Sequence, residues 1–272
     1  MTLSQLYYRL CATRWGHHAA RLALRTARQL GWRREFHTPL DALELDHAAC
    51  AGLMRLWQRV HWSSGDGMMP PRQLFALYRL ATTWPVHGDI VELGSWVGLT
   101  TSYLATACLV RGAGQVHAVD TFAGTKEGDA HYPSVERFGG STLGAFRAQI
   151  ARAGVSARVH EIVGLTAKAA ASYAGNPIRV LLIDADHSYE GVRTDFEAWW
   201  PLVAPNGLIV FHDYAMPSVA RFVDEIREHH SGILDAPGLV EENVFAVTKR
   251  AALPAALVAC PVSELQPAAC VS

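Results

Sequence analysis

Short, largely apolar runs alternate with amphipathic segments along most of the chain after residue 70. The runs predict strands at 89–93, 115–119, 158–163, 179–183 and 208–211. The spacing of apolar residues between them predicts helices at 98–111, 142–153, 166–174, 189–199 and 217–229. Strands that alternate with helices in this way form a parallel sheet with helices on both faces. The pattern therefore predicts a doubly wound, Rossmann-like α/β domain with a mostly parallel sheet.

The segments that flank this pattern complete the predicted organisation. A helix is expected over 73–83, and the stretch "LVEENVFAVT" (239–248) predicts two further strands or one bent strand at an antiparallel edge. We divide the chain into a basic helical extension (1–62), the main domain (63–249) and an Ala/Pro-rich tail (250–272).

The N-terminal extension is strongly basic. Seven arginines and no acidic residue precede Glu35, and Leu3, Leu6, Tyr7 and Leu10 are spaced as one face of a helix. Arginines interrupt any apolar stretch here, which argues against an ordinary secretory signal. The pattern favours an accessory helix that packs on the core or on a second copy, so a homo-oligomer through this region is expected. The alternative is a basic helix that binds a membrane surface or another protein.

Composition excludes several classes of protein. The chain has 272 residues, 50% of them hydrophobic, and a formal net charge of −1. Near-neutral charge gives no general attraction to nucleic acid. The five cysteines are scattered and form no C-x-x-C pair, which is typical of reduced thiols in the cytoplasm. No apolar run approaches the roughly 20 residues of a transmembrane helix.

Acidic residues stand at the ends of four predicted strands: Glu92, Asp120, Asp184 and Asp213. Open α/β sheets bind ligands outside the carboxyl ends of their strands, where the strand order reverses. We therefore expect these four side chains to gather along one edge of the sheet.

The first strand runs into a glycine-containing loop, "ELGSWVGLTT" (92–101). Gly94 can adopt a backbone conformation closed to other residues, and Gly98 allows the next helix to approach closely. Dehydrogenases carry G-x-G-x-x-G at this turn, and the G-x-x-x-G spacing found here argues against a dinucleotide. Asp120, after the second strand, is placed to accept hydrogen bonds from both hydroxyls of a ribose.

Three motifs, "VELGSWVGLTT", "HAVDTFAG" and "LLIDADHSYEGVRTDFEAWWPLVAPNGLIVFHDY", together resemble a class I S-adenosylmethionine-dependent methyltransferase. The resemblance covers roughly residues 65–248. The chain resembles in particular the small-molecule O-methyltransferases of natural-product pathways, the macrocin O-methyltransferase and cephalosporin-hydroxylase-like group. The resemblance implies S-adenosylmethionine as cofactor and a small-molecule acceptor. It also implies a set of cofactor-binding residues: Met69, Glu92, Gly94, Ser95, Gly98, Thr100, Asp120, Gly164 and Asp184.

A divalent metal is the second expected cofactor. Carboxylates at the ends of two neighbouring strands, Asp184 and Asp213, suit a Mg²⁺-like ion that would hold a substrate hydroxyl and lower its pKa. The resemblance implies an acidic pair at the second position, but His212 stands where an acid is usual. Imidazole also binds several divalent ions, so we expect Asp184, His212 and Asp213 to form the metal site.

His187 lies three residues after Asp184, and the resemblance implies that the residue at this offset removes the proton of the substrate. Asp184 and His187 are therefore the expected catalytic residues. The alternative for His187 is a structural role at the start of the following helix. We expect Asp186 to cap that helix near Tyr189, and Trp199 and Trp200 to belong to the core.

The polar segment between Thr121 and Ser141 is longer than an ordinary strand–helix loop. It is expected either to cover the acceptor through His131, Tyr132 and Phe138 or to be disordered.

Together these observations predict methyl transfer from S-adenosylmethionine to a hydroxyl of a small molecule, a natural product or its sugar. The alternatives are N- or C-methylation, a non-methylating accessory role, or a cofactor-binding partner protein without turnover. A nucleic-acid methyltransferase is disfavoured by the neutral charge and by the absence of an N/D-P-P-Y motif.

Overall fold

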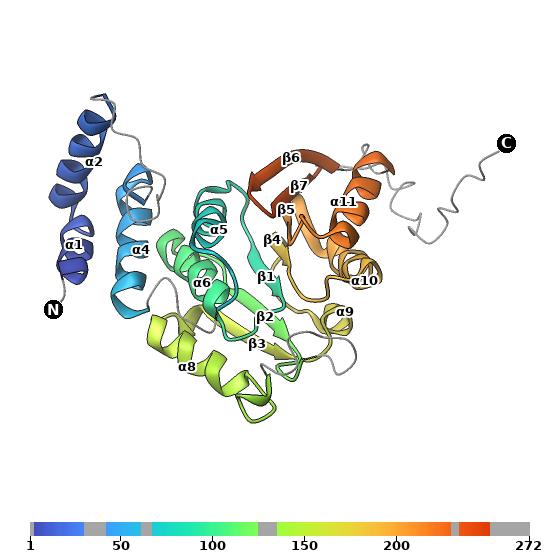
Figure 1. Ribbon diagram of the computed structural model, residues 1–272. Helices are drawn as coiled ribbons and strands as arrows, with labels where there is room; N and C mark the ends of the chain where they lie inside the picture. The colour runs from blue at the N-terminus through green and yellow to red at the C-terminus, as the bar shows by residue number, and fades with distance from the viewer. Residues whose placement is uncertain (1–2, 30–41, 61–66, 125–134, 230–233, 251–272) are drawn as a thin grey trace.

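A seven-stranded sheet forms the centre of the molecule (Figure 1). The computed structural model describes residues 3–29, 42–60, 67–124, 135–229 and 234–250. The strand order is β3-β2-β1-β4-β5-β7-β6. The strands are β1 (Asp89–Leu93), β2 (Val116–Asp120), β3 (Val159–Val163), β4 (Ile178–Ile183), β5 (Val203–His212), β6 (Leu234–Glu241) and β7 (Val244–Lys249).

Strands β1 to β5 are parallel, and β7 joins β5 in the antiparallel sense with β6 beyond it. The expected Rossmann-like, mostly parallel fold is confirmed. Residues 239–248 contribute to two strands, which reverse at Asn243 in a left-handed conformation (φ 69°). The order reverses between β1 and β4, which is where such sheets bind ligands.

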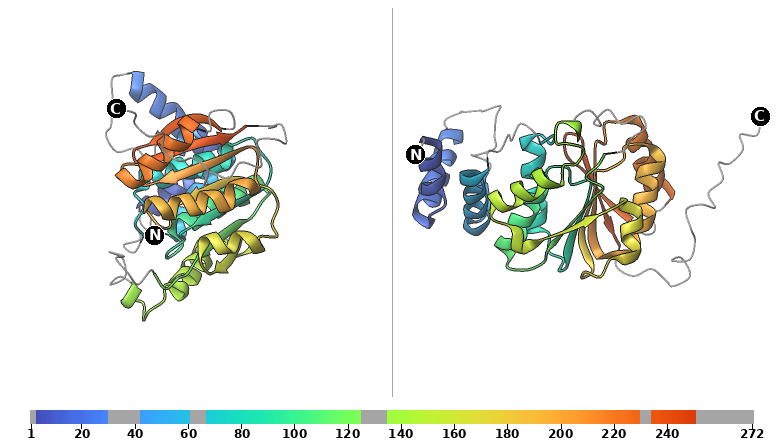
Figure 2. Two further views of the ribbon diagram at one scale, coloured as in Figure 1. Left: turned by 90° about the vertical axis from the view of Figure 1, so that its right-hand side faces the viewer. Right: turned by 90° about the horizontal axis from the view of Figure 1, so that it is seen from below.

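Helices cover both faces of the sheet, and the end-on view in Figure 2 shows the three layers. In the described residues, the α-helices before β1 are α1 (Leu3–Cys11), α2 (Arg14–Gln29), α4 (His47–Arg59) and α5 (Pro71–Thr83). The others are α6 (Leu99–Arg111), α8 (Leu143–Ala153), α9 (Thr166–Ala169), α10 (Tyr189–Trp199) and α11 (Pro217–His229). Short 3₁₀ turns lie at Ala42–Glu44, Ser156–Arg158, Ala170–Ser172 and Trp200–Leu202.

The helix predicted over 166–174 is shorter than expected. It ends as an α-helix at Ala169 and continues as a 3₁₀ turn only to Ser172. Tyr173, the next residue, is extended (φ −65°, ψ 122°), and its N–H donates to the main-chain oxygen of Ala170, so the helical turn ends there before the chain enters β4.

Two apolar clusters hold the layers together. One joins α4, α5, α6 and α8 to one face of the sheet, and the other joins α9, α10 and α11 to the opposite face. Trp199 is fully buried in the second cluster, which confirms its expected place in the core. No helix in the described part of the chain combines the length and apolarity needed to span a bilayer.

Helix α4 is bound tightly to the main domain. Leu53 and Met54 are completely buried, and Trp57 donates a hydrogen bond from Nε1 to the Tyr103 hydroxyl of α6 at 2.8 Å. Helices α1 and α2 lie outside α4, away from the sheet (Figure 1). The apolar core therefore extends into the segment that the sequence pattern placed in an N-terminal extension.

Replacing Leu53 with alanine is expected to lower the free energy of unfolding by about 2–5 kcal/mol, because the cavity would lie inside a continuous core. Urea unfolding followed by circular dichroism measures this value. Because α4 shares the core, we expect one cooperative transition for the variant. A separate early transition for a stable main domain would contradict this prediction.

Candidate active site

A pocket of about 880 Å³ lies at the carboxyl ends of β1, β2, β4 and β5. Its volume falls within the usual range of small-molecule sites, about 300–1,000 Å³. The expected residues that line it are Met69, Gly94, Ser95, Thr100, Asp120, Asp184, His187, His212 and Asp213. Three of the four strand-end acids therefore meet at one pocket, and the fourth, Glu92, does not line it.

The loop after β1 requires glycine at Gly94. Its φ is 88°, and a Cβ there would lie 2.1 Å from the main-chain oxygen of Asp184. The loop after β1 and the end of β4 therefore approach each other more closely than any side chain would permit.

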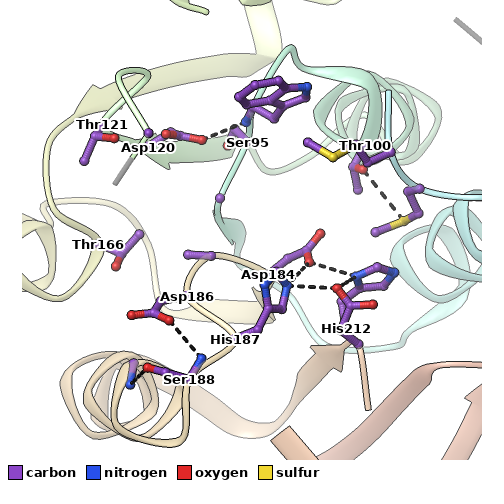
Figure 3. A pocket seen from close by; sticks show the side chains of 18 of the residues that line it. Ser95, Thr100, Asp120, Thr121, Thr166, Asp184, Asp186, His187, Ser188 and His212 are labelled. Carbon is purple, nitrogen blue, oxygen red and sulfur yellow. Dashed lines mark hydrogen bonds and ion pairs between the residues drawn. The ribbon is translucent and has the colours of Figure 1, made fainter. Parts of the chain in front are cut away.

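Asp120 lies in the upper part of the pocket as Figure 3 shows it. Its Oδ2 accepts a hydrogen bond from the main-chain N–H of Trp96, and its Oδ1 accepts one from that of Phe122, both at 2.7 Å. Trp96 and Phe122 both have positive φ angles, 47° and 55°. The carboxylate thus fixes two unusual backbone turns and still has acceptor capacity toward the pocket.

The side chain of Glu92 is completely buried beneath the pocket. Side chains alternate between the two faces along a strand, so Glu92 lies on the same face of β1 as Ile90, the face that α6 covers. There its Oε2 accepts hydrogen bonds from the hydroxyls of Ser95 (2.9 Å) and Thr101. Burial raises the pKa of Glu92 to about 8. Among the residues that the structure describes, its other oxygen, Oε1, has no hydrogen-bond partner. Glu92 therefore supports the loop from below.

Replacing Glu92 with glutamine is expected to change how stability depends on pH. The pKa in the folded state lies above the unfolded value, so folding favours the protonated acid and wild-type stability falls as pH rises from about 4.5 to about 8. Glutamine has no proton to lose and removes this dependence. Urea unfolding of both proteins at pH 6, 7, 8 and 9 should show the variant gaining relative to wild type. A constant difference would contradict the prediction.

Four further expected residues have distinct places. Thr100 contacts Met69 through its hydroxyl (Oγ1 to Sδ, 3.7 Å), and both line the pocket. Gly98 and Gly164 lie outside the lining. Gly98 lets α6 begin against Phe146 of α8, since a Cβ would lie 2.9 Å from that ring. Gly164 donates from its N–H to the main-chain oxygen of Asp120 at 2.9 Å.

Two imidazoles and two carboxylates converge across the pocket from Asp120 (Figure 3). One possible ligand atom from each of Asp184, His187, His212 and Asp213 lies within 4.8 Å of the other three. His212 Nδ1 is 2.8 Å from Asp184 Oδ1 and 3.2 Å from Asp213 Oδ2. His187 Nε2 is 2.8 Å from Asp213 Oδ2 and 3.5 Å from Asp184 Oδ1.

Strand register brings this cluster together. Ile183 pairs with Phe211 across β4 and β5, so Asp184 and His212 leave the sheet side by side. Asp213 follows with a positive φ of 54°, which turns its carboxylate back toward both imidazoles. Aspartate is among the few residues other than glycine that adopt this conformation readily.

The cluster is supported from outside by two residues that were not predicted from the sequence. Gln73 Oε1 lies 2.7 Å from His212 Nε2, and Asn243 Nδ2 donates to Asp213 Oδ1 at 2.6 Å. Gln73 comes from the first turn of α5 and Asn243 from the β6–β7 turn, far from the cluster in sequence. No local pattern marks them, because only the folded chain brings them to these atoms.

The two carboxylates strongly change the acid–base behaviour of the imidazoles. Hydrogen bonds to Asp184 and Asp213 raise the pKa of His187 to about 9. Burial opposes the charge on His212, but Asp184 and Asp213 outweigh it and raise its pKa to about 10. The same contacts hold the pKa of Asp213 well below its usual range. With no cation bound, both imidazoles therefore carry a proton at neutral pH.

The helix after this cluster begins differently from the prediction. Ser188 caps α10 by accepting from the N–H of Gly191, and Asp186 instead accepts from the N–H of Ser188 at 2.8 Å. The prediction that Asp186 is the cap was wrong because the helix begins at Tyr189, directly after Ser188.

Of the three residues expected to cover the acceptor, His131 and Tyr132 lie outside the described residues. The ring of Phe138 packs edge-on against that of Trp96, with the ring centroids 6.0 Å apart.

The amino-acid sequence matches a known protein family over the same region. Residues 91–214 match a family model described as "Methyltransferase domain". This range begins in β1 and ends just after Asp213, so it contains Asp120 and the four cluster residues.

Several solved structures, methyltransferases among them, share the fold. The O-methyltransferase NovP is 19% identical, with 68% of this chain and 83% of NovP covered and a TM-score of 0.57. A protein from Corynebacterium glutamicum is 15% identical, with 77% and 93% covered and a TM-score of 0.53. An S-adenosylhomocysteine-bound methyltransferase from Podospora anserina, PaMTH1, is 16% identical, with 76% and 89% covered and a TM-score of 0.51.

The family match and the shared fold agree with the pocket geometry, in which the glycine loop, Asp120 and Asp184 surround one cavity. Residues 91–214 therefore carry a methyltransferase domain, as the resemblance in the sequence implied.

Proposed function

We propose that this enzyme transfers the methyl group of S-adenosylmethionine to a hydroxyl of a small molecule, such as a natural product or its sugar. The observation that carries the proposal is the arrangement in one pocket of Asp120 at one side and the four-residue cluster at the other. The first suits a nucleoside, and the second suits an oxygen that must lose its proton.

In this proposal the cofactor lies along the glycine loop. Asp120 accepts hydrogen bonds from the ribose hydroxyls, and Gly94, Ser95, Thr100 and Met69 surround the methionine end. Their positions in the pocket lining support these roles. The role of Glu92 is indirect, since it fixes Ser95 and the start of α6 from below. The methyl group would then face the cluster that contains Asp184.

The cluster fits a divalent cation. Two carboxylates and two imidazoles are all metal-binding side chains, and one possible ligand atom from each lies within 4.8 Å of the others. Asp184, His187, His212 and Asp213 would hold the ion. When bound, such an ion supplies positive charge that lowers the pKa of a hydroxyl beside it.

The chain contributes position and proton handling. The pocket places the acceptor oxygen in line with the methyl sulfonium, and holding reactants in such geometry can remove several kcal/mol of barrier. The new O–C bond forms as the S–C bond breaks, which yields a methyl ether and S-adenosylhomocysteine. The hydroxyl proton would pass to a carboxylate oxygen of Asp184 or Asp213, both of which line the pocket, and from there to water.

Acceptor profiling tests the proposal. The full chain is incubated with methyl-labelled S-adenosylmethionine and three groups of small molecules: sugars and phenols, amines, and activated carbon acids. We expect the label in a methyl ether of the first group, identified by NMR and mass spectrometry. Label confined to amines or carbon acids would replace O-methylation with the alternative reactions. Cofactor binding without transfer to any group would favour an accessory role.

Self-association through the N-terminal helices stays a prediction. Large apolar side chains are exposed there, with Leu10 at 55%, Trp15 at 88% and Leu22 at 60% of their surface. A second copy that covered them would support the expected homo-oligomer.

A further inference from the structure

We infer that the four-residue cluster selects a transition-metal ion such as Mn²⁺, Fe²⁺, Co²⁺ or Zn²⁺ over Mg²⁺. Both His187 and His212 would bind the ion directly, together with Asp184 and Asp213. The inference rests on the proposed function, because it names the ion that the same site holds.

The donor set is half nitrogen. Mg²⁺ binds oxygen ligands and retains several waters, whereas imidazole suits Zn²⁺, Fe²⁺ and neighbouring transition ions. In the described part of the chain, Asp184 and Asp213 are the cluster's carboxylates, and imidazoles occupy its other two positions. The two carboxylates also balance the charge of one divalent ion, so neutral imidazoles complete the set.

Hydrogen bonds outside the cluster orient His212 for this role. Gln73 Nε2 donates to the main-chain oxygen of Glu242 at 2.8 Å, which fixes the direction of the Gln73 amide. Gln73 Oε1 therefore faces His212 Nε2 as an acceptor, so that this nitrogen must carry a hydrogen. In neutral His212 the lone pair is then on Nδ1, which faces Asp184 and Asp213. Such outer contacts are typical of metal-binding histidines.

His187 completes the set from the loop that precedes α10. Ser218 donates to its main-chain oxygen at 2.6 Å, which holds this segment against α11. Its Nε2 lies 2.8 Å from Asp213 Oδ2 and 3.5 Å from Asp184 Oδ1, among the possible ligand atoms of the cluster. An ion among the four side chains could contact one possible ligand atom of each. Binding an ion through Nε2 would remove His187 from the role of general base.

Metal titration of the full-length protein, stripped with chelator, tests the inference. Dissociation constants for Mg²⁺, Mn²⁺, Co²⁺ and Zn²⁺ are measured by calorimetry on wild type and on His212→Asp. Because carboxylate sites also prefer the later ions, the decisive value is the ratio of the Mg²⁺ to the Co²⁺ dissociation constant. We expect His212→Asp to lower this ratio at least tenfold. His87→Gln, at an exposed histidine, is the matched control and should leave it unchanged.

Pulsed EPR of the Mn²⁺-loaded protein reads the ligands directly. We expect ¹⁴N couplings from imidazole in wild type, weaker couplings in His212→Asp, and their loss in the double variant His187→Gln/His212→Asp. A spectrum without ¹⁴N coupling, an unchanged ion ratio, or failure of all four ions to bind would overturn the inference. Binding of S-adenosylhomocysteine, measured on the same samples, tests the cofactor-binding part of the proposed function separately. Failure to transfer methyl groups would count against the proposed function and not against this ion preference.

Discussion

Replacing Asp213 with asparagine is expected to lower methyl transfer about 10²–10⁴-fold. The carboxylate approaches both imidazoles of the cluster, and an amide cannot supply its negative charge to them or to a bound cation. Such an ion contributes several kcal/mol to charge stabilisation, and each 1.4 kcal/mol corresponds to a factor of about ten in rate. Asparagine tolerates the positive φ at this position, so the fold should be retained.

Initial rates with the acceptor identified by profiling measure this effect. Affinity for S-adenosylhomocysteine should stay within about threefold of wild type, because each 1.4 kcal/mol of lost contact would change it tenfold and Asp213 has no proposed cofactor contact. Asp224→Asn makes the same chemical change on the exposed surface of α11 and is the matched control. A variant at Asp213 that keeps at least a third of wild-type activity would show that the cluster has no part in the reaction.

Replacing Asp120 with alanine is expected to weaken binding of S-adenosylhomocysteine at least about 100-fold. Two hydrogen bonds to a charged acceptor contribute about 1.5–3 kcal/mol each, and 1.4 kcal/mol corresponds to a factor of ten in affinity. The variant also loses the contacts that hold the N–H groups of Trp96 and Phe122, so the loops on both sides of the ribose site would loosen.

Calorimetric titration with S-adenosylhomocysteine measures this affinity, and thermal unfolding of the free proteins checks that the variant is folded. Asp213→Asn provides a reciprocal control, since it should impair transfer while it keeps cofactor binding. Binding by a folded Asp120→Ala protein within threefold of wild type would exclude Asp120 from the cofactor site.

Local sequence patterns predicted most of the fold. Apolar runs and helical spacing are properties of neighbouring residues, so they located all five parallel strands and the helices between them. The same patterns did not predict that α9 ends as early as Ala169 or that β5 begins at Val203. A bulge in the pairing of β4 with β5 and a positive φ at Asn206 (60°) carry β5 through a polar stretch that resembles a loop.

The sequence by itself determined which chemical groups reach the edge of the sheet. Asp120, Asp184 and Asp213 follow apolar strands directly, and the carboxyl ends of parallel strands share one edge, so their convergence followed from the order of the chain. Gly94 was likewise recognisable, because a tight turn after a strand needs a residue without a side chain.

Only the tertiary structure decided how these groups are paired. The alternation of side chains along β1 placed Glu92 beneath the pocket, although sequence position suggested its edge. The register of β4 with β5 set His212 beside Asp184, and the packing of α5 and of the β6–β7 turn supplied Gln73 and Asn243. Hydrogen bonds and electrostatic contacts act over a few ångströms in space, whatever the separation along the chain. For that reason the sequence could name the members of the cluster, and the fold alone fixed their protonation and orientation.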